Sequence, residues 1–310
     1  MPARSPAEDA GPAGRGGVLV VDKPAGPTSH DIVAVVRRRF RGAKVGHTGT
    51  LDPFATGVLP VVIGRATRLA RYLSGADKEY DALIRLGLVT DTWDATGTVV
   101  GETPAGSPIP SAGALADALG SYRGTWMQTP PAFSAKLAAG VRAYEQARRG
   151  ESVELAPVAV TVSALELLSV DGPLVRIRLV SSAGFYVRAL AHDLGVKLGT
   201  GATLQGLRRL RSGPFGLGDA VTLDAVVQAD VAAKVLPLEA LLTDRPAVTL
   251  TQEGADRIAH GREVGPAQCA GGPSGAPAGA EIRLLDPGGR LVAIGAAMPG
   301  GVLRPAVVLV

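Results

Sequence analysis

The 310-residue sequence has few of the residues that build disulfide frameworks and metal centres. It contains one cysteine, Cys269, and four histidines that lie far apart in the chain: His30, His47, His192 and His260. One cysteine cannot form an internal disulfide, and histidines without ligand spacing do not indicate a metal site. We therefore expect a reducing, cytoplasmic environment and no bound metal.

The sequence also lacks long apolar runs and nucleotide-binding motifs. No apolar stretch approaches the roughly 18 residues that a membrane span needs. Residues 1–15 carry acids and prolines without an apolar stretch, which predicts a disordered tail rather than a signal peptide. No Walker loop or dinucleotide fingerprint is present. These absences argue against a membrane protein and against P-loop or dinucleotide binding.

What the sequence does contain is enough apolar material for a large core. Hydrophobic residues make up 46% of the chain and charged residues 19%, which suits one large domain and a smaller one. Strand patterns recur through residues 18–212, with helical patterns between them and several hairpin-like returns. This predicts an α+β domain around a large mixed or antiparallel sheet. After about residue 243 the pattern changes to a small β-rich module, so we expect a main domain over 16–242 and a second domain over 243–310.

Local signals predict individual elements. Thr28 and Asp31 have the spacing of a capping box, which predicts that a helix begins there. Pro60 lies within an apolar run, which predicts an edge strand or a bulge. The segment RAYEQARRG, residues 142–150, is typical of a helix, whereas the glycine- and alanine-rich residues 267–281 predict a loop.

Basic residues gather in three places, although the net charge is only +4 and the isoelectric point is near 9.4. The first cluster covers residues 37–44; the other two are Arg65, Arg68 and Arg71, and Arg208, Arg209 and Arg211. Such clusters can neutralise phosphates, which favours a polyanionic partner. The alternative is that each cluster is an ordinary solvated surface. Arginine supplies most of the charge, since the chain has six lysines, and arginine suits bidentate phosphate contacts.

One acidic residue stands out because of its surroundings. Residues 46–64 read GHTGTLDPFATGVLPVVIG, and Asp52 is the single acid among them. Asp-Pro is common in turns, so Asp52 alone predicts a turn. The other interpretation is that the loop displays a reactive carboxylate.

Several further segments follow a recognisable order along the chain: DKPAGPTSHD, GRATRLARYL, DKEYDALIRLG, TDTWDATG, QTPPAFSA, YEQARRG, SSAGFYVRALAHDLG and LRRLRSGPF. Together with GHTGTLDPFATGVLPV, they make the chain from about residue 16 resemble the bacterial tRNA pseudouridine-55 synthases of the TruB type. The C-terminal portion resembles the small RNA-binding PUA module. Two positions depart from the family: Phe133 replaces a usual tyrosine, and Lys136 comes one place before the usual basic residue.

The resemblance implies a reaction and its catalytic residues. The family detaches uracil from its ribose at N1, rotates it and rejoins it through C5, so ATP, a redox cofactor and a metal are not required. Asp52 matches the catalytic aspartate, which attacks or stabilises the reacting nucleoside. Arg188 matches the arginine that pairs with this aspartate and keeps it ionised. Tyr80 matches the tyrosine that stacks on the target base, and it is also a candidate for removing the C5 proton.

The resemblance also implies substrate-binding positions. His47 matches the histidine that helps to hold the target loop open, and Leu207 is expected to line a dry pocket. Gly46 and Thr48, which flank His47 in the signature, are expected to bind substrate. Lys23 either touches the RNA or holds its own turn.

The implied partner is tRNA, whose T-loop uridine must be flipped out before it reacts. A monomer is expected, and Asp91 and Asp94 are interpreted as loop-forming acids near the RNA. Three other functions stay open. The chain could be an RNA chaperone without catalysis, a synthase for another RNA position, or a glycosidase or nucleosidase, although glycosidases usually need two carboxylates.

Overall fold

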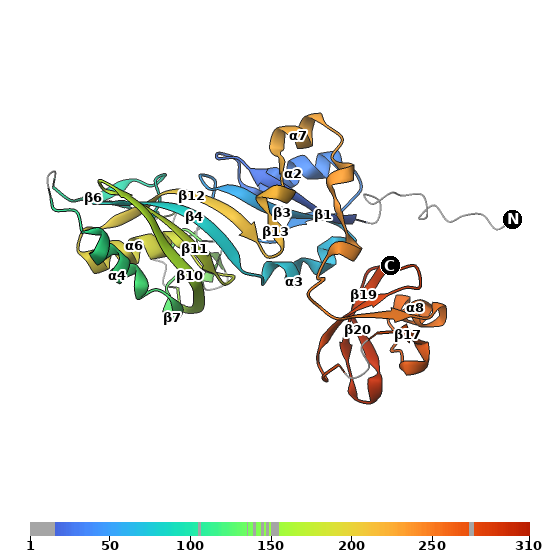
Figure 1. Ribbon diagram of the computed structural model, residues 1–310. Helices are drawn as coiled ribbons and strands as arrows, with labels where there is room; N and C mark the ends of the chain where they lie inside the picture. Colours follow the sequence, from blue (N-terminus) through green and yellow to red (C-terminus); the bar gives the residue numbers. More distant parts are fainter. Residues whose placement is uncertain are drawn as a thin grey trace.

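The computed structural model describes residues 16–104, 107–134, 136–138, 141–143, 146, 149, 155–272 and 276–310. The predicted tail over 1–15 and most of the predicted helix over 142–150 lie outside these residues. The described residues form a large part built on an eleven-stranded sheet and a smaller part built on a five-stranded sheet (Figure 1). The predicted α+β architecture is confirmed.

The elements of the large part run from residue 16 to residue 240. The strands of its main sheet are β1 (Gly16–Lys23), β2 (Val45–His47), β3 (Thr56–Gly64), β4 (Lys78–Leu86), β7 (Gly124–Gln128), β10 (Val158–Asp171), β11 (Leu174–Ser181), β12 (Ala202–Ser212), β13 (Phe215–Gly216), β14 (Val221–Thr222) and β15 (Leu236–Pro237). Two short hairpins are β5 (Leu88–Thr90) with β6 (Val99–Glu102), and β8 (Leu137–Ala138) with β9 (Val141–Arg142). The helices are α2 (Ser29–Arg39), α3 (Ala70–Ser74), α4 (Ala112–Gly120), α6 (Val187–Leu198) and α7 (Leu223–Gln228), with short 3-10 turns that include η1 (Arg65–Leu69).

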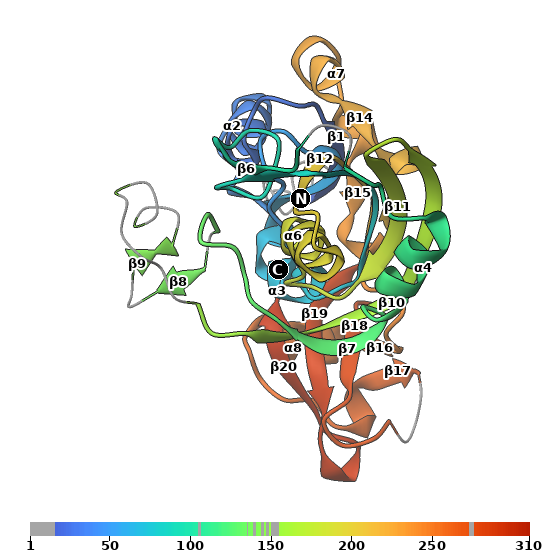
Figure 2. The same cartoon turned by 90° about the vertical axis from the view of Figure 1, so that its left-hand side faces the viewer.

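The main sheet is mixed. Its strands follow the order β14-β1-β3-β12-β4-β11-β10-β7, and most neighbours are antiparallel. The pairs β1–β14 and β3–β12 are parallel. The sheet curves around α6 (Figure 2), whose apolar side chains pack into the main core. The parallel pairing of β3 with β12 brings the loop that precedes β3 close to β12, which pairs on its other side with β4.

The central strands are buried on both faces, which explains their uninterrupted apolar sequences. In β1, Leu19 and Val21 face the main core, whereas Val18 and Val20 face a second core. The second core also contains side chains of η1 and α3 and three from the C-terminal part: Leu291, Ile294 and Leu309. The smaller part is therefore packed directly against the larger one.

The predicted start of α2 is confirmed. Thr28 is the N-cap, its side-chain oxygen accepts from the Asp31 backbone N–H at 3.1 Å, and Asp31 accepts from the Thr28 N–H at 2.8 Å. This reciprocal pair satisfies two backbone donors that a helix start leaves free. It fixes the position of Ser29, which contacts the Asp52 loop.

The prediction that Pro60 marks an edge strand or a bulge is wrong. β3 lies between β1 and β12, and its register with β1 has no shift. The Pro60 carbonyl accepts from the Thr48 N–H at 3.2 Å, so the proline nitrogen faces the same side. On that side the pairing passes from β12 to β2. An interior strand accepts proline here because the ladder is interrupted at that point.

The smaller part contains β16 (Ala247–Leu250), α8 (Gln252–Ala259), β17 (Cys269–Gly271), β18 (Glu281–Leu285), β19 (Leu291–Ala297) and β20 (Leu303–Val308). Its strand order is β17-β16-β18-β19-β20, which confirms the predicted β-rich module. The predicted loop over 267–281 is partly wrong, because Cys269–Gly271 pairs with β16 as an edge strand. Residues 273–275 lie outside the described part. No helix among the described residues is both long and apolar enough to cross a membrane.

Candidate active site

Asp52 lies in the loop between β2 and β3, and both interpretations of it are supported. The Ala55 N–H donates to the Asp52 carbonyl at 3.1 Å, so residues 52–55 form a turn. The Asp52 side chain nevertheless remains 33% exposed and faces the buried guanidinium of Arg188, which is 5% exposed. The turn therefore presents the carboxylate to solvent on one side and to a fixed cation on the other.

Lys23 fixes the backbone of this turn through its buried ammonium group. Its side chain is fully buried, and its ammonium donates to the carbonyls of Pro24 at 2.9 Å, Pro53 at 3.0 Å and Ala55 at 2.7 Å. Burial lowers the pKa of Lys23 to about 8, whereas the charge of Asp52 acts to raise it. The Pro24 contact supports the predicted role of holding its own turn, and the other two contacts hold the 52–55 turn as well. The geometry does not favour the alternative RNA contact, because all three ammonium donors already have protein acceptors.

Ser29 and Arg209 hold the preceding residues of the loop. Ser29 Oγ accepts from the Leu51 N–H at 2.9 Å and donates to the Leu51 carbonyl at 3.1 Å. Arg209 is 1% exposed and donates to the carbonyls of Val58 at 2.7 Å, Gly49 at 3.0 Å and Thr50 at 3.4 Å. Two buried cations thus fix the backbone on both sides of Asp52.

Arg209 is too deeply buried to contact phosphates, which corrects the prediction for this member of the third arginine cluster. Its two neighbours on β12 are also paired with protein groups, Arg208 with Asp22 at 2.8 Å and Arg211 with Glu79 at 3.3 Å. Tyr80 interacts with the Arg209 guanidinium through its side chain. This cluster therefore supports the sheet and the Asp52 loop. The sequence missed this because it does not show which arginines of a strand face inward.

Arg188 is the centre of the site's charged network. Its Nε lies 3.0 Å from Asp52 Oδ2, and its Nη2 donates to Asp52 Oδ1 at 3.3 Å. Nη2 also donates to the Phe133 carbonyl at 2.8 Å, and Nη1 donates to the Thr92 carbonyl at 2.9 Å. The two-point contact fixes the orientation of the carboxylate as well as its charge. Because Phe133 contributes its backbone, the departure from tyrosine leaves this contact unchanged.

Asp94 is a second carboxylate at Arg188, which the sequence predicted only as a loop-forming acid. Its Oδ2 lies 3.4 Å from Arg188 Nη1, and its side chain is 5% exposed. Its Oδ1 accepts from the Thr96 N–H at 2.9 Å and from Thr92 Oγ1 at 3.0 Å. Asp94 therefore shapes its loop, as predicted, and in addition holds the far side of the guanidinium. Asp91 is also loop-forming, since its Oδ1 accepts from the Thr98 N–H at 2.8 Å.

The electrostatics of Asp52 differ from the expectation that Arg188 keeps it simply ionised. Burial raises the pKa of Asp52 above its ordinary value and is the largest influence on it. Arg188 acts to lower this pKa, as does Lys23, whereas Asp94 adds to the increase. A reaction that needs the carboxylate form is therefore expected to fade as the pH falls through a value above the ~4 of a free aspartic acid.

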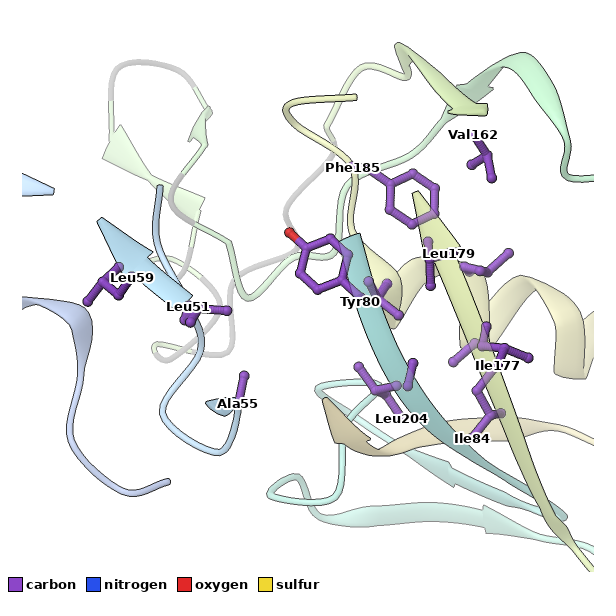
Figure 3. Close-up of a cluster of buried hydrophobic side chains, with 14 of the residues drawn as sticks. Leu51, Ala55, Leu59, Tyr80, Ile84, Val162, Ile177, Leu179, Phe185 and Leu204 are labelled. Atoms are coloured by element: carbon purple, nitrogen blue, oxygen red, sulfur yellow. The ribbon is translucent and has the colours of Figure 1, made fainter. Parts of the chain in front are cut away.

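Tyr80 and Leu207 lie on neighbouring strands beside this loop. Tyr80 belongs to β4, is nearly buried, and points its hydroxyl toward the segment that carries Leu51 (Figure 3). Leu207 belongs to β12 and packs, partly buried, against the same core. Leu51, which precedes Asp52, belongs to the same core as Tyr80, and Leu207 packs against that core; that Leu207 lines a pocket stays a prediction.

His47, Gly46 and Thr48 lie in and directly after β2, at the start of the loop. His47 Nδ1 accepts from the Gly49 N–H at 3.3 Å, and its ring meets His30 edge to face at 5.6 Å. Burial lowers the pKa of His47, and the nearby His30 and Arg209 act in the same direction. His47 and Gly46 are partly exposed, but Thr48 is buried, so its side chain does not face the solvent from which a substrate would approach.

The other two basic clusters remain at the surface in part. At the end of α2 and in the turn that follows, Arg38, Arg41 and Lys44 are exposed, whereas Arg39 pairs with Asp230 at 3.0 Å. In the second cluster, Arg68 donates to the Val308 carbonyl at 2.6 Å, which joins the two parts of the chain. Across the described part of the chain, no group of three His, Cys, Asp or Glu side chains is arranged to hold a metal ion.

Replacing Lys23 with methionine is expected to reduce the free energy of unfolding by about 2–3 kcal/mol, because three buried carbonyls lose their donor. Urea unfolding measures this change. The affinity for tRNA should stay within about twofold, since the ammonium does not face the solvent. The exposed Lys234 is the matched control, and Lys234→Met should leave stability unchanged. Weaker RNA binding by Lys23→Met at unchanged stability would favour the direct RNA contact.

Three family models match this chain in succession. The N-terminal domain of TruB family pseudouridylate synthases matches residues 37–187, and the C-terminal domain of tRNA pseudouridylate synthase B matches residues 188–243. The C-terminal domain of pseudouridine synthase II TruB matches residues 246–309. The matches cover the smaller sheet and every strand of the main sheet except β1.

Individual proteins match over nearly the whole chain. The tRNA pseudouridine synthase B of Solibacter usitatus is 43% identical over 94% of this chain and 99% of its own length. That of Geobacter sulfurreducens is 45% identical over 88% of this chain and 90% of its own length. Among solved structures, an H/ACA RNP bound to a substrate RNA containing 2'-deoxyuridine has a chain with a TM-score of 0.73 and 26% identity, covering 99% of this chain and 92% of that one.

Proposed function

The chain belongs to the TruB family of pseudouridylate synthases, and we propose that it acts on uridine 55 in the T-loop of tRNA with Asp52 as the reacting carboxylate. Pseudouridine formation in tRNA is the activity of the relatives it matches over most of its length, and it is the activity of this chain. The observation that carries the proposal is the partly exposed Asp52 carboxylate in two-point contact with the buried Arg188.

The reaction is an isomerisation that balances within one nucleoside. The N1–C1' bond breaks, the base turns, a C5–C1' bond forms, the C5 proton leaves and N1 gains a proton. The protein must supply a group that attacks or stabilises the nucleoside while the base is detached. Asp52 is the candidate, whether it adds to the base or acts at the sugar. Lys23 and Arg209 hold the loop backbone, so the carboxylate is positioned before substrate arrives.

Arg188, Tyr80 and Leu207 complete the proposed pocket. Arg188 favours the ionised form of Asp52 and fixes its orientation. The Tyr80 ring stacks on the detached base, and its hydroxyl is the candidate for removing the C5 proton. Leu207 excludes water from the intermediate. These roles follow from matching positions in the family, and the clustering of the three side chains around the Asp52 loop supports them.

The target uridine lies within a folded RNA loop, so we propose that it is flipped out into this pocket. His47 and Gly46, partly exposed at the start of the loop, would occupy the gap left by the base. The exposed Arg38, Arg41 and Lys44 lie at the end of α2 and just before β2, on the approach to His47. They are the basic residues that we assign to the RNA backbone, whose phosphates position the substrate without selecting its sequence.

We further propose that residues 16–242 form the catalytic domain and residues 243–310 an RNA-binding domain of the PUA type, acting together as a monomer. The small five-stranded module packs against β1 through Leu291, Ile294 and Leu309. The related chain of an H/ACA RNP that is bound to a substrate RNA has the same overall fold. This supports an RNA-binding role for the fold as a whole.

The surroundings of the second carboxylate, Asp94, argue against a glycosidase. A pair of catalytic acids would need both groups free to reach the sugar, but Asp94 is 5% exposed, contacts Arg188 and accepts bonds from its own loop. A chaperone without catalysis would not require a carboxylate paired with a buried arginine on a loop whose backbone is fixed by two more buried cations. Neither of these alternative functions explains why two buried cations, Lys23 and Arg209, both bind the backbone of one loop.

The position of the reacting uridine is tested with tRNA transcripts made with C5-tritiated uridine. We expect tritium release from the unchanged transcript and from a transcript in which a T-loop uridine other than uridine 55 is replaced by cytidine. We expect no release from the T-loop when uridine 55 itself is replaced by cytidine. Release that persists from T-loop uridine when position 55 is cytidine would assign another target. Tight binding without release from any transcript would leave only the chaperone.

A further inference from the structure

Trp93 has an unusual backbone conformation next to the active site. Its φ is 62°, and among the described residues only Leu242 shares a positive φ without being glycine. Bulky side chains rarely adopt this region, and such strain persists only where surrounding contacts enforce it. The strained residue belongs to the loop between β5 and β6.

The neighbours of Trp93 explain why this strain matters. The preceding residue, Thr92, accepts from Arg188 Nη1 through its carbonyl at 2.9 Å, and the following residue, Asp94, lies 3.4 Å from the same nitrogen. Reversal of the chain at Trp93 brings both acceptors to one atom of the guanidinium. If the backbone relaxed at Trp93, Arg188 would lose two of its contacts.

A ring stack fixes the side chain of Trp93. Its indole lies parallel to the His192 imidazole, with ring centroids 4.2 Å apart and an interplanar angle of 9°. His192 lies on α6 four residues after Arg188, so the two side chains share one helix face. Both rings are partly exposed, which distinguishes the stack from ordinary core packing.

We propose that Trp93 and His192 are positioning residues for the chemical step: their stack holds the 92–94 backbone in its strained form and thereby fixes Arg188 against Asp52. This inference rests on the proposed role of Asp52. The stack ties the loop to the same helix that carries Arg188, so the acceptors and the guanidinium move as one unit. Its loss lets Arg188 move away from Asp52 without removing any group that touches the substrate.

The test measures single-turnover tritium release against pH for three variants. Trp93→Gly removes the ring while allowing the backbone to keep a positive φ, and His192→Ala removes the other ring. His192→Phe keeps a ring that can stack but cannot titrate. Trp126→Ala, at the only other tryptophan, is the matched control, because the Trp126 ring packs on Tyr122 and Phe185 and is not part of the stack with His192. Affinity for tRNA and thermal stability are measured alongside.

We expect Trp93→Gly and His192→Ala to slow release about tenfold near neutral pH, which is about 1.4 kcal/mol of activation free energy. The acid limb of their profiles should move to higher pH, because the pKa of Asp52 rises when the guanidinium moves away. His192→Phe should restore rate and profile, and tRNA affinity should stay unchanged. The double variant Trp93→Gly with His192→Ala should be no slower than either single variant, since both remove one interaction.

Two results would overturn the inference. One is a loss of rate that is equal at every pH, occurs also in His192→Phe and parallels the loss of thermal stability. This combination would indicate a purely structural effect of the substitutions. The other is a loss that appears only in tRNA affinity, which would make the rings an RNA contact. Asp52→Asn in the same assay distinguishes failure of the proposed function from failure of this inference. If it releases tritium normally, the proposed function fails; if it is inactive while the Trp93 and His192 variants match wild type, only this inference fails.

Discussion

Asp52→Asn is expected to lose C5 tritium release by about 10⁴-fold or more, the scale seen when a reacting carboxylate or nucleophile is removed. Asparagine has nearly the same shape, so the turn at 52–55 and the contacts of Lys23 should survive. What is lost is the negative charge that Arg188 holds toward the substrate. The affinity for tRNA should stay within about threefold, because the residues that we propose to contact phosphates, Arg38, Arg41 and Lys44, lie outside this turn.

The matched control for this variant is Asp81→Asn. Asp81 also forms a close arginine pair, with Arg176 at 2.7 Å, and it is adjacent in sequence to Tyr80 but lies in an exposed pair on the sheet surface. Exposed ion pairs contribute little to stability, so release should remain within about twofold of wild type. An Asp52→Asn rate within tenfold of wild type, with Asp81→Asn unchanged, would contradict the catalytic role of Asp52.

Arg188→Met is expected to reduce single-turnover release by about 10²-fold to 10³-fold and to change its pH dependence. Burial already raises the pKa of Asp52, and Arg188 is the group that opposes this most strongly. Removing the guanidinium therefore raises the pKa further, so the active carboxylate form is lost at a higher pH than in wild type. The loss should be largest in acid and smaller as the pH rises.

Arg188→Lys is the informative companion of this variant. Lysine keeps a positive charge but cannot contact both oxygens of Asp52 and the Thr92 and Phe133 carbonyls at once. We expect it to restore most of the pH dependence and only part of the rate. Equal acid limbs for wild type and Arg188→Met would show that Arg188 does not control the ionisation of Asp52.

Local signals in the sequence predicted local structure well. The capping box at Thr28 and Asp31 is confirmed, as are the mixed sheet and the expected hairpin-like returns, of which β10 with β11 is one. Each depends on neighbouring residues or on an alternating pattern, which a single chain displays directly. The loop of Asp52 was found from its composition and from a family signature, and its turn is confirmed.

Features that depend on distant partners were missed or misread. Arg209 looked like part of a phosphate-binding cluster, yet its donors meet carbonyls about 150 residues away in sequence. Gly57 belongs to the same contact, because a Cβ there would collide with the Arg209 backbone and its φ is 103°. Pro60 was read as an edge residue because sequence does not show where β12 gives way to β2. The contact of Arg188 with a second carboxylate, that of Asp94, likewise arises from tertiary packing alone.

The most direct test of the central claim is the structure of the Asp52→Asn protein bound to a T-arm RNA. We predict that uridine 55 lies outside its loop, with its base against Tyr80 and Leu207 and its C1' or C6 atom within about 3.5 Å of the side chain of residue 52, the range for reacting groups. A uridine 55 that remains stacked in the RNA loop, or one bound with Arg188 and residue 52 facing another nucleotide, would contradict the account.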